Sequence, residues 1–435
     1  MENKAHHSED ELIEKAELPS RQAMIWHPFY KGKIEVMLKA AVPDFDSFSV
    51  WYTPGVAASC NAIHENPRLS YEHTARGNRI AIISDGTRIL GLGDIGPAAG
   101  MPVLEGKSLL FKYLGGVDAV PLAIETKDPD KIIEFVEMIA PSFSGINLED
   151  IAHPKCFYIL DELRKRNIDK GLGLCIWHDD QQGTASVTLA GAINALKLAK
   201  KKKETALVVF NGAGAANIAI ARVMETAGFP IENMVMCDSH GILSRDRAHE
   251  FAPDDWRKFP DKYRMCMESN REGRSGDLAS AVKGVDLLIS ASVPKPGVIT
   301  RDHVKMMGER PIVFACANPL PEIYPWVARD AGAYIVATGR SDFPNQINNS
   351  LGFPGIFRGA LDVLASTITD EMAIAAAFEI AKTAEESDYF DLEHIVPTMD
   401  DWQLFPREAV AVGLKAIEQG VARRKLTREE LYESA

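Results

Sequence analysis

The sequence predicts an α/β protein in which an N-terminal mixed α/β domain precedes a C-terminal Rossmann-like domain with a doubly wound parallel sheet. Three observations support this fold class. The chain has 435 residues, more than one hydrophobic core normally accommodates. Its second half alternates short apolar runs with helical patterns, which is typical of a parallel sheet covered by helices. Gly212 and Gly214 directly follow one of these apolar runs, as in a dinucleotide-binding turn.

The N-terminal domain is expected to span residues 1–176 and to begin with a charged, helix-prone arm at residues 1–25. Aliphatic runs bounded by turn residues indicate strands, and apolar residues at helical spacing indicate a helix. These patterns predict strands at residues 80–84 and 120–124, a turn at 85–86 followed by an apolar run at 89–92, strand-like runs at 146–148 and 174–177, and a helix at 131–139.

The second domain is expected to span residues 177–435 and to end in helices. A long helix is predicted at residues 183–202, because this stretch is rich in Ala and Leu. The lysines at its end could form a phosphate-binding patch, but cations favoured by the negative end of the helix dipole are the preferred interpretation. The remaining patterns predict strands at residues 205–210, 234–237, 286–290, 311–315 and 333–337, with helices from the glycine turn to Ala227 and near 278–282.

Composition restricts the class of partner. The formal charge of -13 argues against a nucleic-acid surface and against attraction to anionic membranes, but it does not exclude anionic metabolites. The six cysteines are scattered without a C-x-x-C pair, which favours buried reduced thiols over a disulfide or zinc framework. No apolar run approaches the roughly 20 residues that a membrane span needs. We therefore expect a cytoplasmic protein that acts on a small molecule.

The glycine turn is expected to hold a dinucleotide. Gly212 permits the tight turn, and Gly214 lets the backbone approach a pyrophosphate at the start of a helix that begins with Ala215 and Ala216. The third motif position is Asn217 instead of Gly or Ala, which is expected to loosen the packing of helix on strand. Asp238 ends the next predicted strand, where an acid accepts hydrogen bonds from the adenine ribose.

Asp238 favours NAD as the cofactor, whereas the nearby His240 and Arg245 leave NADP open. A plain glycine turn followed by a strand-capping Asp is the alternative without a ligand. The register of strand, turn, helix and acid favours the dinucleotide site.

Two pairs of adjacent acids follow apolar, strand-like runs: Glu149-Asp150 and Asp179-Asp180. Adjacent carboxylates repel each other, and an oxygen-seeking Mg²⁺ or Mn²⁺ that takes ligands from both segments would offset that repulsion. Either pair alone is more often a solvated turn, and Asp180 alone is also a suitable helix cap. Sequence spacing does not show whether the two pairs meet.

Taken together, these motifs resemble the malic enzymes, in order, over about residues 30–425. The motifs that carry the resemblance are YTPGVA at 52–57, SDG at 84–86, LGLGDIG at 90–96, EGK at 105–107, NLEDI at 147–151, HDDQQGTA at 178–185, ANP at 317–319, GRSDFPNQ at 339–346, NN at 348–349 and FPG at 353–355. The resemblance implies metal-dependent oxidation and decarboxylation of malate to pyruvate and CO₂, with reduction of NAD or NADP.

The resemblance also implies roles for individual residues. The implied metal ligands are Glu149, Asp150 and Asp180, and Asp179 would support the site catalytically. Lys107 would be the general base and Tyr52 the general acid. The implied substrate contacts are Arg88, Asn318 and Asn349, and Asn318 would also contact the cofactor. A homodimer or homotetramer is implied as well.

The chemistry of the residues agrees with these roles, although each residue alone would be unremarkable. A buried Lys107 near another cation such as Lys112 is expected to have a lowered pKa that suits a base. Tyr52 precedes a Thr-Pro-Gly turn that can present a phenol to a cleft. Arg88 has the planar fork that binds carboxylates through two hydrogen bonds.

Two other functions remain open at this point. A malolactic-type enzyme would use the same residues, retain its cofactor and release lactate. A non-catalytic dinucleotide-binding regulator is the other alternative, against which the complete set of implied catalytic residues argues. Gln182 departs from the His that many short bacterial forms carry, and this leaves the cofactor choice open.

Overall fold

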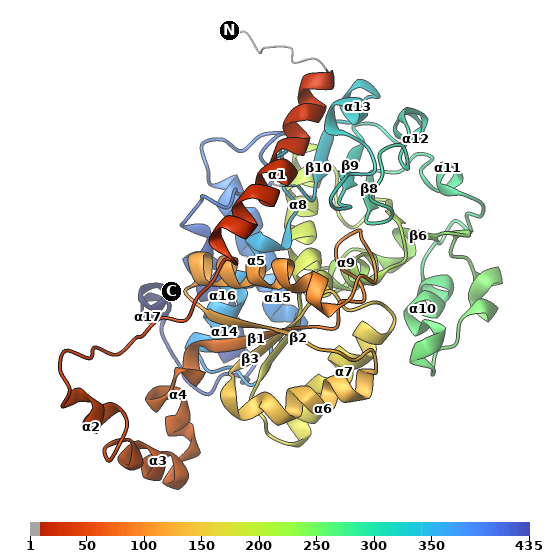
Figure 1. Ribbon diagram of the computed structural model, residues 1–435. Helices are drawn as coiled ribbons and strands as arrows, with labels where there is room; N and C mark the ends of the chain where they lie inside the picture. Colours follow the sequence, from red (N-terminus) through yellow and green to blue (C-terminus); the bar gives the residue numbers. More distant parts are fainter. Residues whose placement is uncertain (1–8, 341) are drawn as a thin grey trace.

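The computed structural model describes residues 9–340 and 342–435. Residues 1–8, which belong to the predicted arm, and Ser341 of the 339–346 motif lie outside the described residues. The strands are β1 Arg79–Ser84, β2 Asp118–Ala123, β3 Gly145–Leu148, β4 Cys175–His178, β5 Val208–Asn211, β6 Met234–Asp238, β7 Gly241–Ile242, β8 Leu287–Ser290, β9 Ile312–Ala315 and β10 Ile335–Thr338. They form two separate sheets (Figure 1).

Helices cover both sheets and also form the N-terminal arm. Their bounds are α1 Glu9–Tyr30, α2 Ser47–Trp51, α3 Val56–Glu65, α4 Ser70–His73, α5 Pro97–Gly115, α6 Pro129–Ile139, α7 Lys155–Asp169, α8 Thr184–Leu198, α9 Ala215–Thr226, α10 Pro260–Glu268, α11 Leu278–Ala281, α12 Arg301–Met306, α13 Pro325–Asp330, α14 Phe353–Asp362, α15 Asp370–Glu385, α16 Leu404–Glu418 and α17 Arg428–Ser434.

The first sheet has the order β2-β1-β3-β4, and its strands are parallel. Alternate residues of β1 point to opposite faces, and both faces are buried. Ala81 and Ile83 share a core with α6 and α7, whereas Ile80 and Ile82 share a core with α5, α14 and α16. Because both faces are covered, the strand reads as a continuous apolar run.

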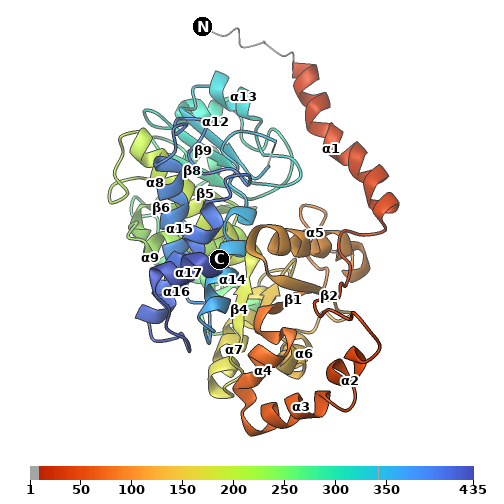
Figure 2. The same ribbon diagram turned by 90° about the vertical axis from the view of Figure 1, so that its left-hand side faces the viewer.

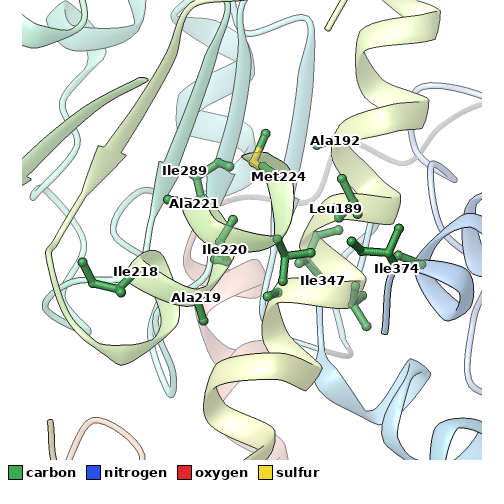
Figure 3. Close-up of a cluster of buried hydrophobic side chains, with 14 of the residues drawn as sticks. Leu189, Ala192, Ile218, Ala219, Ile220, Ala221, Met224, Ile289, Ile347 and Ile374 are labelled. Carbon is green, nitrogen blue, oxygen red and sulfur yellow. The ribbon is translucent and has the colours of Figure 1, made fainter. Parts of the chain in front are cut away.

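The second sheet has the order β10-β9-β8-β5-β6-β7 and is parallel except for β7. The strand order reverses at β5, since β6 lies on one side of it and β8 on the other. In open α/β sheets this switch point is where ligands bind. Figure 3 shows part of the core near these strands, where Met224 of α9 lies near Ile289 of β8 and Leu189 of α8 belongs to the same buried cluster.

The C-terminal helices return to the first sheet. Phe353 and Phe357 of α14 pack on Phe111 of α5, with ring centroids 4.5 and 5.2 Å apart. The division expected between residues 176 and 177 falls inside β4 of the first sheet. The two expected domains therefore share packing, because the end of the chain covers the sheet built by its beginning.

The N-terminal arm comprises α1, α2, α3 and the segments between them, residues 9–65, and is longer than the expected 1–25; it extends away from this body. Figure 2 shows that α1 lies apart from both sheets. In Figure 1, α2 and α3 lie at the lower left, to one side of the first sheet. Large apolar side chains on the arm are exposed, among them Trp26, Phe29, Leu38 and Trp51. Such a surface marks an interaction site on a folded protein.

The predicted fold class is confirmed, and most predicted strands and helices lie within a few residues of the observed ones. The helix predicted at 183–202 is shorter, because a π-helical turn, η4 Asp179–Gly183, precedes α8 and Lys200 adopts a left-handed conformation after it ends. The apolar run at 89–92 is a loop with a single bridge between Ile89 and Gly93. In the part of the chain that the structure describes, no helix is both long and apolar enough to cross a bilayer.

Candidate active site

A cleft of about 410 Å³ lies where the carboxyl ends of strands from both sheets meet. Parallel strands end at one edge of their sheet, so the residues that follow them converge. The sequence-predicted residues that line the cleft are Arg88, Lys107, Glu149, Asp150, Asp180, Gly214, Ala215, Ala216, Asn318 and Asn349. The expected substrate, metal and pyrophosphate positions therefore belong to a single cavity.

The acidic cluster follows from strand register. Leu148 at the end of β3 pairs with His178 at the end of β4, which places the residues after each strand side by side. One carboxylate oxygen each from Glu149, Asp150 and Asp180 lies within 4.8 Å of the others. Asp150 adopts a left-handed conformation with φ of 55°, and its N–H donates to Asp180 Oδ2 at 2.7 Å.

Removal from water perturbs these acids. Burial raises the pKa of Asp150 to about 8, and the neighbouring charge of Asp180 adds to the effect. Burial also raises the pKa of Glu149 well above its usual range and raises the pKa of Asp180. Each acid makes ionisation of the others harder, so the cluster favours a bound positive charge.

The donor set fits a hard divalent cation. The atoms offered are carboxylate oxygens, which Mg²⁺ and Mn²⁺ prefer. Asp150 Oδ2 is buried and has no hydrogen-bond partner among the described residues. Asn147 Nδ2 donates to Glu149 Oε2 at 2.9 Å and so orients that carboxylate. A buried acceptor without a donor is costly, and a cation would satisfy it.

Lys107 projects from α5 into this cluster. Its Nζ lies 3.2 Å from Glu149 Oε1 and forms a short ion pair with Asp179. Asp179 is fully buried, and its Oδ1 accepts a hydrogen bond of 3.0 Å from Trp177 Nε1. Asp179 therefore lies behind Lys107, outside the group of three acids that face one another.

The prediction that Lys107 has a lowered pKa is wrong. Burial tends to lower its pKa, but the charges of Asp179, Glu149 and Asp180 outweigh burial and raise it. The nearby cation named from the sequence, Lys112, instead pairs with Asp118 at 2.7 Å on the exposed side of the helix. Two residues five positions apart on a helix point to different faces, so Lys112 does not lie near Lys107 as the sequence suggested.

The glycine turn has the expected position at the end of β5. Gly212 has φ of +104°, and a Cβ there would lie 2.6 Å from the carbonyl oxygen of Ala291. Gly214 precedes α9 and lines the cleft with Ala215 and Ala216. The backbone is therefore open where a pyrophosphate approaches a helix N-terminus.

The expectation that Asn217 loosens this turn is wrong. The side chain is fully buried, and its Nδ2 donates to the carbonyl oxygens of Asn211 at 2.9 Å and Gly212 at 2.8 Å. The amide thus fastens the helix to the turn. A glycine or alanine at this position has no donor for either carbonyl.

Asp238 ends β6 as predicted but does not line the cleft. Its side chain is only 7% exposed and forms an ion pair with Arg247 at 2.9 Å. The glycine turn and the acidic cluster line the cleft. Asp238 lies outside it, at the end of β6, the strand that pairs with β5.

The three expected substrate contacts border the cleft. Arg88 is exposed to it, and the backbone N–H of Arg88 donates to the Asp150 carbonyl at 3.0 Å. Asn318 follows β9 and precedes a cis peptide bond with Pro319. Asn349 belongs to the turn before α14 and lines the same cleft.

Tyr52 is not brought to the cleft within this chain. It directly follows α2 on the arm, it is 71% exposed, and it does not line the cavity. The sequence predicted that Tyr52 lies at a turn, but it carries no information on where that turn lies relative to the cleft.

Two further residues of this region were not identified from the sequence. Glu322 is fully buried and accepts hydrogen bonds from Ser290 Oγ, Ser292 N and Ala317 N, which fixes the loops after β8 and β9. An acid soon after the Asn-Pro motif was the available signal. His153 lines the cleft near Gly214, and burial lowers its pKa to about 4.

Gln182 has two hydrogen bonds. Its Oε1 accepts from His178 N at 3.1 Å, and its Nε2 donates to Asp370 Oδ1 at 3.1 Å. The side chain connects the end of β4 to the start of α15. An amide supplies both an acceptor and a donor, which accounts for Gln at this position.

Comparisons with known proteins agree over most of the chain. The family model "Malic enzyme, NAD binding domain" matches residues 181–417, and "Malic enzyme, N-terminal domain" matches residues 31–129 and 124–164. The "Bifunctional malic/malolactic enzyme" of Bacillus subtilis is 45% identical over 95% of this chain and 96% of its own.

Relatives of both cofactor types are similar. The "NAD-dependent malic enzyme" of Geobacillus stearothermophilus is 46% identical over 90% of this chain and 78% of its own. The "NADP-dependent malic enzyme" of Halomonas elongata is 40% identical over 90% and 92%. The crystal structure of Entamoeba histolytica malic enzyme superposes with a TM-score of 0.93 at 47% identity, over 99% of this chain and 88% of that one.

Proposed function

This chain belongs to the malic enzyme family, as its motifs predicted, and we propose that the cleft oxidises and decarboxylates malate to pyruvate and CO₂ with reduction of a nicotinamide dinucleotide. The observation that carries the proposal is the position of Lys107 between Asp179 and the acids Glu149, Asp150 and Asp180, in the cavity that the glycine turn also lines. Family membership argues against a non-catalytic regulator.

We propose Glu149, Asp150 and Asp180 as ligands of Mg²⁺ or Mn²⁺. Their buried oxygens and the unpartnered Asp150 Oδ2 support this assignment. When bound, the cation supplies positive charge that offsets the carboxylates around Lys107 and stabilises negative charge developing on the substrate oxygens.

The other residues handle protons and position the substrate. Lys107 takes the proton of the malate C2 hydroxyl in its neutral amine form, which the positive charge of the bound cation favours over the form that the acids alone stabilise. Asp179 contacts Nζ and holds Lys107 in place. Arg88 pairs with a substrate carboxylate, while the amides of Asn318 and Asn349 orient the substrate from the second sheet and from the α14 turn. Gly212, Gly214, Ala215 and Ala216 hold the pyrophosphate.

Tyr52 is the proposed general acid that protonates C3 of the substrate, and for this role its phenol must lie in a cleft. We infer that the chain forms a homodimer in which the arm of one copy covers the other and supplies Tyr52 to its cleft. The exposed apolar side chains of the arm support this arrangement; they include Trp26, Phe29, Tyr30, Leu38, Phe45 and Trp51. A two-fold axis would complete both sites at once.

A malolactic reaction is the second candidate, favoured by the bifunctional relative from Bacillus subtilis. One assay separates the two: malate, Mn²⁺ and oxidised NAD or NADP, with reduced cofactor, pyruvate and lactate all measured. We expect equal amounts of reduced cofactor and pyruvate, and no turnover with chelator. Lactate without net cofactor reduction would contradict oxidative decarboxylation.

We place the reaction in the cytoplasm. All six cysteines are free, although four of them are buried deep enough to be protected in any compartment. Cys316 is partly buried and Cys60 is exposed, and free thiols at such accessible positions suit a reducing environment.

A further inference from the structure

We propose that three residues outside the cleft lining, Asp85, Thr87 and Lys155, position its contacts for substrate and metal. Through one buried network they hold Arg88, the proposed partner of a substrate carboxylate, beside Asp150, a proposed metal ligand. This inference rests on the proposed function, since Arg88 and Asp150 have these roles only in that reaction. The substrate contact and the metal ligand would then depend on the same few hydrogen bonds.

Arg88 and Asp150 belong to two loops that follow neighbouring strands. Residues 85–90 follow β1, and residues 149–153 follow β3, which pairs with β1. The backbone N–H of Arg88 donates to the Asp150 carbonyl at 3.0 Å, and the N–H of Leu90 donates to Asp150 Oδ1 at 3.3 Å. Because the second bond reaches the carboxylate itself, a shift of the first loop would reorient the proposed metal ligand.

Asp150 needs this support because its backbone is strained. Its φ of 55° lies in the left-handed region, which is unfavourable for a residue with a side chain. Such a conformation persists only where the surrounding structure holds it. Here the surrounding contacts are the hydrogen bonds from the N–H groups of Arg88 and Leu90 and the bond from Asp150 N to Asp180.

Thr87 joins the two loops through its hydroxyl group. The hydroxyl donates to Asp85 Oδ1 at 2.6 Å and accepts from the Ala152 N–H at 2.9 Å. The N–H of Thr87 also donates to Asp85 Oδ1, at 3.1 Å. Thr87 is buried, so a lost partner would leave the other group unpaired away from water. Thr87 therefore fastens the segment before Arg88 to the segment after Asp150.

Lys155 anchors the other end of the network. The Asp85 side chain is fully buried, and its Oδ2 accepts a short hydrogen bond from Lys155 Nζ. Lys155 is itself largely buried, and its Nζ also donates to the Lys127 carbonyl at 3.3 Å. A buried carboxylate is costly unless it is paired and hydrogen-bonded, and both oxygens of Asp85 have partners. Asp85 is thus a fixed acceptor for Thr87.

Helix stability does not account for Lys155. It is the first residue of α7, at the positive end of the helix dipole, where a cation is unfavourable. A buried ion pair is often no more stable than apolar residues of the same volume, because desolvation of both charges offsets their attraction. The pair does fix the direction of Asp85 Oδ1 toward Thr87. These features agree with a positioning role.

The test compares Thr87→Val with Thr87→Ser. Valine matches threonine in shape but lacks the hydroxyl, whereas serine retains it. The Kd for Mn²⁺ is measured by calorimetry on the full-length protein without substrate. It should rise about tenfold or more in Thr87→Val, since loss of the groups that orient a metal ligand has this effect, and it should stay within about threefold of wild type in Thr87→Ser.

Kinetics with Mn²⁺ in excess give the second measurement. In Thr87→Val the KM for malate should rise about tenfold through Arg88, while the KM for the dinucleotide changes less than about threefold. The two differ because the glycine turn follows β5 of the other sheet. Lys155→Met should show the same pattern. The control is Lys165→Met, a change at an exposed lysine of the same helix, which should behave as wild type.

An unchanged Kd for Mn²⁺ or an unchanged KM for malate in Thr87→Val would overturn the proposal, as would equal losses in Thr87→Ser. A matching rise in the KM for the dinucleotide would indicate a general loss of structure and would also overturn it. A wild type that binds no Mn²⁺ would overturn both this inference and the metal assignment. If the wild type oxidises no malate while Thr87→Val still loses Mn²⁺ affinity, the proposed function fails and the positioning of the metal site stands.

Discussion

Lys107 Nζ lies 3.2 Å from Glu149 Oε1, so the proposed proton acceptor is in direct contact with a proposed metal ligand. Metal binding, proton transfer and the charge on this lysine are therefore linked. A change at either residue should therefore alter more than one measurable property.

Metal affinity should depend steeply on pH. The raised pKa of Asp150, about 8, means that the acid holds a proton below that pH and must lose it to bind a cation. The Kd for Mn²⁺ should therefore rise by up to about tenfold for each pH unit below 8. Titration at pH 6.5, 7.5 and 8.5 checks this, and Asp150→Asn should bind weakly at every pH. Asp94→Asn, a change at a surface acid, should behave as wild type.

Lys107→Met should lower kcat/KM by about 10²–10⁴-fold, the usual range for a general acid–base residue. Removal of the ammonium group leaves Asp179 and Glu149 without a cationic partner in the protein, so Mn²⁺ should still bind at pH 8. The control is Lys112→Met on the exposed side of α5. Comparable loss in both variants would remove Lys107 from its proposed role.

Tyr52 and Lys107 should complement each other between subunits. Tyr52→Phe and Lys107→Met homodimers should each be nearly inactive. After equal mixing with subunit exchange, half the dimers are mixed and each has one intact site, which gives about a quarter of wild-type activity. No recovery despite demonstrated exchange would mean that Tyr52 acts within its own chain or not at all.

Asn217→Ala should weaken dinucleotide binding. The change removes the donor to the Asn211 and Gly212 carbonyls, and leaving buried polar groups unpaired costs about 1–3 kcal/mol. The KM for the dinucleotide should rise while the KM for malate changes little. Asn217→Asp keeps the shape but places an anion beside the carbonyls, so it should be worse. Improved binding in Asn217→Ala would restore the idea that Asn217 loosens the turn.

Glu408 should make stability fall as pH rises. It is fully buried on α16, neither of its carboxylate oxygens has a partner among the described residues, and burial raises its pKa well above the usual 4.5. The folded protein therefore retains a proton that the unfolded chain releases above about pH 4.5. Stability lost in this way amounts to at most about 1.4 kcal/mol per pH unit until the folded pKa is reached.

Glu408→Gln lacks this titration, so its melting temperature relative to wild type should increase from pH 5 to pH 8. Glu418→Gln changes an exposed acid on the same helix and is the matched control. A difference between Glu408→Gln and wild type that stays constant with pH would show that Glu408 is not protonated in the folded protein.

The sequence predicted the order of the elements and the local motifs well. The strands around residues 80–84 and 286–290 are apolar on both faces because both sides of each sheet are covered, and that pattern is visible in the residues themselves. The glycine turn was equally clear, since strand, turn and helix follow one another within a short segment.

What sequence did not determine was which distant side chains meet. The acids after β3 and β4 converge because the two strands pair in register, and Lys107 joins them from a helix about 40 residues earlier in the chain. Asn217 was misjudged because its partners are backbone carbonyls, which have no signature in sequence.

The sequence by itself determined the family, the fold class and the list of residues able to do the chemistry, because these depend on local pattern and motif. Only the tertiary structure decided how those residues are used. Acids and not cations surround Lys107. Asp238 forms ion pairs with Arg247 and Lys262, and Tyr52 lies on an exposed arm. The physical reason is that charge and burial are set by neighbours in space, and most of those neighbours are remote in the chain.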